Sequence, residues 1–76
     1  MNQITVLLAD DQTIIRDGLR ALLETNPDIH VVAEAKNGME AYEQTGIHHP
    51  QVVLMDIRMP QMGGVEATRL IKRDFP

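Results

Sequence analysis

Residues 52–60 have the sequence Val-Val-Leu-Met-Asp-Ile-Arg-Met-Pro, in which four apolar residues lead directly to the carboxylate of Asp56. The apolar run has no alternating polar positions, so it predicts a strand of a parallel sheet whose two faces are both covered by helices. The end of such a strand lies at the edge where open α/β folds bind their ligands. An aspartate after an apolar run is more often a helix cap or a turn residue. A functional interpretation of Asp56 therefore needs support from other parts of the chain.

The length and composition narrow the class of protein. The chain has 76 residues, enough for one small domain, and no cysteine, which excludes disulfides and thiolate metal sites. The formal net charge of −4 disfavours direct binding to a nucleic-acid backbone. The longest apolar runs span four residues, and no basic region followed by an apolar one begins the chain. We therefore expect a soluble, cytoplasmic protein that meets DNA only through another domain.

Two other segments also have the composition of strands. Residues 4–9 form a β-branched and aliphatic run that ends at the carboxylates of Asp10 and Asp11. Residues 29–35 alternate only in part between apolar and polar positions, as expected for a strand nearer the edge of a sheet. The first and third predicted strands therefore both end in acidic side chains.

Residues 12–24 have the periodicity of a helix that ends before Asn26-Pro27, because the residue before a proline is disfavoured in a helix. We expect the apolar stripe to pack on the sheet and the opposite face to be solvated. The stripe consists of Ile14, Ile15, Leu19, Leu22 and Leu23, and the opposite face carries Arg16, Asp17, Arg20 and Glu24.

A second, shorter helix is predicted at residues 38–45. Asn37 has a side chain suited to cap its first turn, and Glu40 is placed to reach back to this cap. Gly46 follows the predicted helix and is typical of a helix end.

A flexible turn at residues 61–64 precedes a third helix at residues 65–75, whose apolar positions recur on one face. The elements thus alternate between strand and helix. Right-handed, short crossovers then favour three parallel strands in the order 2-1-3. This order brings the ends of the first and third strands together, so we expect Asp10, Asp11 and Asp56 to converge in a shallow pocket.

Three converging carboxylates need neutralisation. Two unit charges about 5 Å apart repel by about 3 kcal/mol at an effective dielectric constant near 20. Either one carboxyl group takes up a proton or a hard divalent cation such as Mg²⁺ binds among the oxygens. A bound cation would also make Asp56 a plausible nucleophile toward a phosphoryl group, because it screens the incoming negative charge. The hypothesis from the residues is a phosphoacceptor aspartate.

The chain resembles a known family at this point. The matching segments are LADD at residues 8–11, AKNGMEA at 35–41, VLMDIRMP at 53–60 and MGG at 62–64. Together they resemble the receiver domain of bacterial two-component response regulators. Residues 15–19 and 65–68 are similar to the NarL/FixJ subgroup. The resemblance covers all 76 residues and implies a partial flavodoxin-like α/β fold at residues 1–76.

The resemblance also implies roles for individual residues. Asp56 would accept a phosphoryl group from a sensor histidine kinase or a small acyl phosphate. Asp11 and Asp56 would bind Mg²⁺ directly, the backbone carbonyl of Arg58 would be a further ligand, and Asp10 would act mainly through a water. Pro60, with Met59, would shape the adjoining loop. In a longer protein, the receiver would control a carboxy-terminal helix-turn-helix DNA-binding domain.

Receiver domains of this family have five strand-helix units, and the present sequence resembles the first three. It has no counterpart of the family's hydroxyl residue, lysine and switching aromatic residue beyond the third unit. We therefore expect weak metal binding, slow phosphorylation and no switching by these 76 residues alone. We also expect self-association through the third strand or the helices beside it, since this apolar strand would form an uncharged sheet edge.

Other functions remain open. A receiver-like module used only for association would retain its acidic residues without phosphorylation. A phosphotransferase of the haloacid dehalogenase type also has a nucleophilic aspartate after a strand, but it needs a second aspartate two residues later, where this chain has Arg58. A dinucleotide-binding half-domain would need a glycine-rich turn after the first strand, which this chain lacks. His48 and His49 have no third metal ligand near them in the sequence and are interpreted as loop residues.

Overall fold

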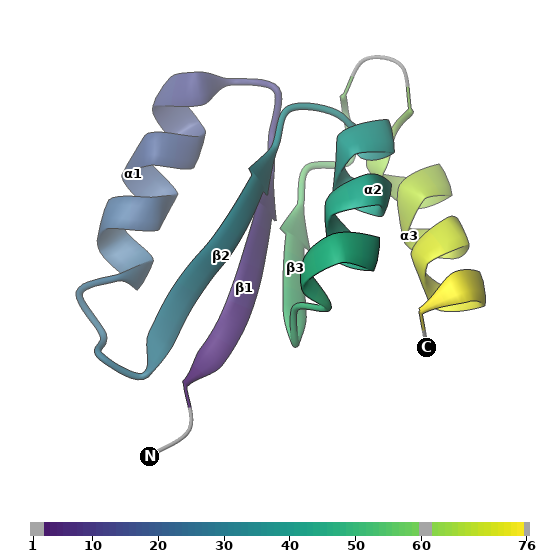
Figure 1. The fold of residues 1–76 in the computed structure, drawn as a ribbon. Helices are drawn as coiled ribbons and strands as arrows, with labels where there is room; N and C mark the ends of the chain where they lie inside the picture. Colours follow the sequence, from purple (N-terminus) through teal and green to yellow (C-terminus); the bar gives the residue numbers. More distant parts are fainter. Residues whose placement is uncertain (1–2, 60–61, 76) are drawn as a thin grey trace.

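The computed structural model describes residues 3–59 and 62–75, and within these residues strands and helices alternate (Figure 1). The elements are β1 (Ile4–Ala9), α1 (Thr13–Leu23), β2 (Ile29–Ala35), α2 (Gly38–His48), β3 (Val52–Met55) and α3 (Gly64–Asp74). The strands are parallel and lie in the order β2-β1-β3, which confirms the predicted 2-1-3 order. No helix in the described part of the chain is both long and apolar enough to cross a membrane.

The sheet separates two layers of helix, with α1 on one face and α2 and α3 on the other (Figure 1). Successive side chains of β1 point to opposite faces, so this central strand contributes to two cores. Leu7 and Ala9 pack toward α2, and Val6 and Leu8 pack toward α1. All four side chains are buried, which makes β1 the most enclosed of the strands.

The pairing of β1 with β2 contains a bulge. Val6 lies opposite Val31, but the next residue of β1, Leu7, lies opposite Ala33, so β2 carries one extra residue. Beyond the bulge, the side chains of β2 that would have faced one side of the sheet face the other side. As a result Val31, which packs with Val6, and Glu34, which contacts α1, lie on the same face of the sheet although three positions separate them.

The prediction that both faces of β3 are covered is wrong for one face. Val53 and Met55 pack against the core on the α2 side, but Val52 and Leu54 are each 41% exposed. The physical reason is the position of β3 at the border of the sheet, because α1 covers β1 and β2 and does not extend over β3 (Figure 1).

The orientation of α1 also differs from the prediction. Ile14 and Leu22, assigned to the packed stripe, are 86% and 67% exposed, whereas Leu23 packs against the core. Arg16, assigned to the solvated face, has a side chain that is only 14% exposed. The helix is turned so that Arg16 faces the sheet, because Glu34 of β2 provides a partner for its charge.

The helix α2 begins as predicted and ends later. The side chain of Asn37 accepts a hydrogen bond from the N–H of Glu40 at 2.8 Å, as predicted, whereas Glu40 accepts one at 3.0 Å from the N–H of Lys36, one residue before the cap. The helix continues to His48 and ends at His49, whose φ of 49° is left-handed. Gly46 therefore lies inside the helix, where a Cβ would come within 3.0 Å of the ring of Phe75. This glycine allows α2 and the end of α3 to approach each other.

Candidate functional site

The ends of the three strands are aligned. Ala9 lies opposite both Ala35 and Met55 in the two ladders of β1. The pairing continues one residue further, because the N–H of Asp10 donates to the carbonyl of Ala35 at 3.0 Å and the N–H of Asp56 donates to the carbonyl of Ala9 at 2.9 Å. Sheet hydrogen bonds therefore place the backbones of Asp10 and Asp56 side by side.

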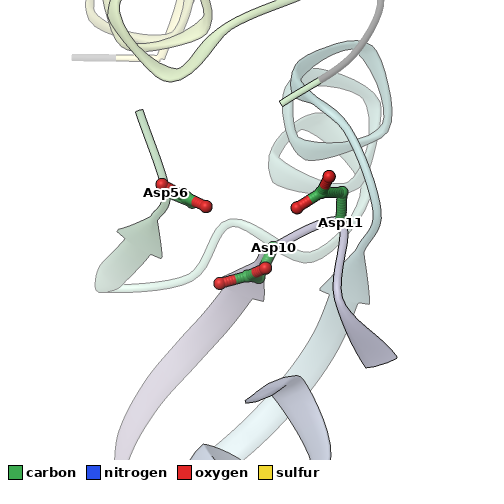
Figure 2. Close-up of side chains that lie close together, drawn as sticks. All are labelled: Asp10, Asp11 and Asp56. Atoms are coloured by element: carbon green, nitrogen blue, oxygen red, sulfur yellow. The ribbon is translucent and has the colours of Figure 1, made fainter. Parts of the chain in front are cut away.

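This alignment brings three carboxylates together, as the sequence predicted. Asp10, Asp11 and Asp56 each offer a carboxylate oxygen, and these atoms all lie within 4.8 Å of one another. Figure 2 shows the carboxylates of Asp11 and Asp56 directed toward the same space, with Asp10 at the end of β1 between their chain segments. The group is accessible to solvent, so a hydrated cation could reach it.

Two of the carboxylates are oriented by backbone N–H groups. Oδ1 of Asp10 accepts a hydrogen bond from the N–H of Gln12 at 2.9 Å, and Oδ1 of Asp56 accepts one from the N–H of Arg58 at 3.2 Å. An ionised carboxylate offers about four lone-pair sites. Each of these side chains therefore keeps acceptor capacity for a cation.

The chain beyond Asp56 is held by two glycines. Gly64 donates its N–H to the carbonyl of Ile57, and Gly38 donates its N–H to the carbonyl of Met62, each at 2.9 Å. A Cβ on Gly64 would overlap the carbonyl of Asp56, and a Cβ on Gly38 would overlap that of Met62. Gly64, which the sequence assigned to the turn at residues 61–64, is instead the first residue of α3 and allows this close packing. Gln61 and Pro60, including the predicted role of Pro60 in the loop, lie outside the described residues.

An open cavity of about 420 Å³ adjoins the acidic group on the α1 side of the sheet. Its polar and charged lining comes from Asp10, Arg16 and Asp56, and its apolar lining comes from Leu8, Ala9, Leu19, Leu54 and Met55. Arg16 is a residue of this region that the sequence did not single out. Its periodic position in α1 suggested solvent, and the only signal for its role is an acidic partner, Glu34, on a predicted strand.

The histidines lie apart from the acidic group. His49 packs edge-on against the ring of Phe75, with the ring centroids 6.1 Å apart. His30 points outward, with a side chain that is 53% exposed and Nδ1 3.8 Å from a carboxylate oxygen of Glu24. Among the described residues, the cluster with metal-binding geometry is that of Asp10, Asp11 and Asp56.

Comparison with known proteins gives consistent results. A family model described as the response regulator receiver domain matches residues 6–76. The transcriptional regulatory protein LnrK of Bacillus subtilis is 47% identical over 73 residues, which are 96% of this chain and 33% of LnrK. The chain thus spans about a third of the length of this curated relative.

Solved structures agree with the family match. The response regulator domain of Thermotoga maritima CheB superimposes with a TM-score of 0.97 at 40% identity, over 99% of this chain and 56% of that one. The signal receiver domain of the putative response regulator NarL from Mycobacterium tuberculosis gives a TM-score of 0.93 at 32% identity, over 96% of this chain and 59% of that one.

Proposed function

Since the chain belongs to the response regulator receiver domain family, we propose that Asp56 is its phosphoacceptor and that Asp10 and Asp11 bind Mg²⁺ together with it. The observation that carries the proposal is the convergence of the three carboxylates within 4.8 Å. Such a group is costly to keep charged unless a cation or a proton neutralises it.

The donor atoms suit Mg²⁺. The candidate ligands are all oxygens, and a site open to solvent lets the cation keep several of its waters. In the proposal Asp11 and Asp56 bind the cation directly, the carbonyl of Arg58 is a further ligand, and Asp10 acts through a water. Bound Mg²⁺ supplies charge neutralisation for the incoming phosphoryl group.

The chemical step belongs to Asp56. A carboxylate oxygen of Asp56 forms a bond to phosphorus, and the bond from phosphorus to the donor breaks with its electron pair leaving on the donor. The donor is a phosphohistidine of a sensor kinase or a small acyl phosphate such as acetyl phosphate. The product is an acyl phosphate on Asp56, so the chain is a regulatory acceptor and not an enzyme acting on other substrates.

The same proposal extends to the longer protein. The name of the relative LnrK describes a transcriptional regulatory protein. We propose that residues 1–76 are part of a receiver domain that controls a DNA-binding domain in the cytoplasm. The net charge of −4 is consistent with DNA contacts being made by that other domain.

The proposal is tested with acetyl phosphate and MgCl₂. Intact-mass measurement should show one phosphoryl group on the chain, and hydroxylamine should remove it because it cleaves acyl phosphates. Asp56→Asn should abolish the labelling, and EDTA should suppress it. Asp17→Asn is the matched control, because Asp17 is an exposed aspartate on α1. Labelling that survives in Asp56→Asn would contradict the assignment.

We also propose that the chain self-associates through β3. If it is never phosphorylated, association would be its whole function. The supporting observation is that β3 is an outer strand with Val52 and Leu54 each 41% exposed. Leu54→Lys should lower the mass measured by light scattering at micromolar concentrations, whereas Ile14→Lys on α1 should not. Two results together would favour a module used only for association over a phosphoacceptor. These are unchanged self-association in Asp56→Asn and no phosphoryl label on Asp56 under any condition.

A further inference from the structure

The guanidinium of Arg16 joins three segments of the chain. Nη1 donates to the main-chain carbonyl of Asp10 at 2.5 Å, and Nε donates to Oε1 of Glu34 on β2 at 3.1 Å. Nη2 lies 3.4 Å from the hydroxyl of Thr13 in the first turn of α1. A planar guanidinium has five donors in fixed directions, so it can hold several acceptors at once in one geometry.

These contacts are protected from solvent. The side chain of Arg16 is 14% exposed and that of Glu34 is 23% exposed. Charge-assisted hydrogen bonds are strengthened where water is excluded, and a half-buried pair is screened less by salt than a surface pair. The hydrogen bond from Arg16 to the carbonyl of Asp10 is therefore stronger than a comparable bond on the exposed surface would be.

The bulge in β2 makes this arrangement possible. Without the register shift after Val31, Glu34 would lie on the α2 face of the sheet and could not reach α1. With the shift, its carboxylate lies beneath the first turns of α1 and faces Arg16. The carbonyl that Arg16 holds belongs to the residue at which β1 leaves the sheet.

We propose that Arg16 is a positioning residue for the acidic site. It holds the carbonyl of Asp10 against Glu34, and this fixes the turn that presents Asp10 and Asp11 toward Asp56. The turn is also held by hydrogen bonds from the N–H of Gln12 to Oδ1 of Asp10 and from the N–H of Asp10 to the carbonyl of Ala35. The consequence for metal binding rests on the proposed function, but the effect on the turn is a property of the metal-free chain.

Arg20 supplies a matched control. It lies one helical turn beyond Arg16 and its Nη1 contacts the other oxygen of Glu34 at 2.7 Å. Its side chain is 48% exposed and also contacts Glu24. Arg20 therefore binds the same Glu34 carboxylate as Arg16, but within the described part of the chain its side chain donates to Glu24 and Glu34 and not to the carbonyl of Asp10. Hydrogen bonds to Glu34 and Glu24 raise the pKa of Arg20.

The metal-free experiment measures amide hydrogen exchange by NMR. Arg16→Ala should speed exchange at the N–H of Gln12 and of Asp10, because the turn loses its side-chain anchor, while Arg20→Ala should leave both unchanged. Arg16→Lys should give an intermediate rate, since an ammonium group cannot bridge the same acceptors. Unchanged exchange at Gln12 in a folded Arg16→Ala chain would overturn the proposal.

The second experiment measures Mg²⁺ affinity by titration calorimetry with MgCl₂. Arg16→Ala should raise the Kd about tenfold, the effect expected when a group that orients a metal ligand is lost. Arg20→Ala should keep the original Kd, and an equal effect of both variants would overturn the proposal. If Arg16→Ala does not fold, Arg16→Lys and Glu34→Gln take its place in both experiments. If the unmodified chain binds no Mg²⁺, the proposed function fails, whereas the exchange rates still decide the role of Arg16.

Discussion

Gly64 donates its backbone N–H to the carbonyl of Ile57 at 2.9 Å and lies so close to the carbonyl of Asp56 that no Cβ fits between them. The first turn of α3 is thus in direct contact with the segment that carries the proposed phosphoacceptor. Among the described glycines none has a positive φ, so the requirement at this position is steric and not conformational.

Gly64→Ala should destabilise the chain. The added methyl group would overlap the backbone of Asp56 and Ile57, and overpacking of this kind costs about 1–3 kcal/mol. Urea denaturation followed by circular dichroism measures the free energy of unfolding. The variant should also bind Mg²⁺ more weakly, because Asp56 must move. Stability equal to that of the unmodified chain would show that the loop relaxes without strain.

Gly18→Ala should have the opposite effect. Gly18 lies inside α1, and apart from its two chain neighbours and the nearby backbone of its own helix a Cβ at this position would meet no atom within 4 Å. Replacing a helical glycine by alanine lowers the entropy of the unfolded chain and should raise the free energy of unfolding by about 0.5–1 kcal/mol. The same urea experiment serves both variants, and a loss of stability in Gly18→Ala would contradict the open surroundings seen at this residue.

The contacts of Asp74 predict a loss of stability in acid. Hydrogen bonds from Arg73 and from the hydroxyl of Tyr42 lower the pKa of Asp74 from 3.8 to about 2. A folded-state pKa below the unfolded value stabilises the fold above pH 3.8, and this contribution disappears as the pH falls toward 2. Unfolding free energies measured between pH 5 and about pH 2 should therefore decrease less steeply in Asp74→Asn than in the unmodified chain.

Tyr42→Phe separates the two causes of this shift. It removes the hydroxyl and keeps the tilted ring contact with Phe75, whose centroid lies 5.6 Å away. Because Arg73 is the larger cause, the variant should retain most of the acid dependence. If Tyr42→Phe and Asp74→Asn have the same pH profile, the tyrosine hydrogen bond is the dominant contact.

His49→Gly should stabilise the end of α2. His49 has a left-handed φ of 49°, a conformation that costs a non-glycine residue about 1–2 kcal/mol. The substitution also removes the contact with Phe75, so the net gain in unfolding free energy should be below about 1 kcal/mol. In a Phe75→Leu background this contact is already absent, and the gain from His49→Gly should be larger. An equal gain there would show that the ring contact contributes nothing, and a gain near zero would show that the strain at His49 is slight.

The sequence was sufficient to predict the order of elements, the strand order and the convergence of the acidic residues. These features depend on signals local to the chain, such as the apolar run of β1 before Asp10 and the run of β3 before Asp56. Once the strands are parallel and ordered 2-1-3, the carboxylates after β1 and β3 must meet at one edge.

The side-chain network of Arg16 could not be predicted in the same way. Helical periodicity shows which residues share a face, but it does not show which face turns toward the sheet. In addition, strict alternation in β2 would place Val31 and Glu34 on opposite faces, and only the bulge puts them on one. The tight approach of Gly64 to Asp56 joins two segments through backbone atoms, which side-chain patterns do not report.

The open cavity beside Asp10 and Asp56 would link two events: the proposed binding of a cation and the covering of the cavity by another segment. Any segment that packs onto its apolar floor, which includes Leu8 and Leu54, would remove water from the two carboxylates. Desolvating uncompensated charges costs free energy, and a bound cation reduces this cost. If a cation binds there as proposed, its binding and the closure of the cavity would favour each other by the same factor, whichever occurs first. The amount of cation bound at the proposed site would thus depend on whether another segment covers the open cavity.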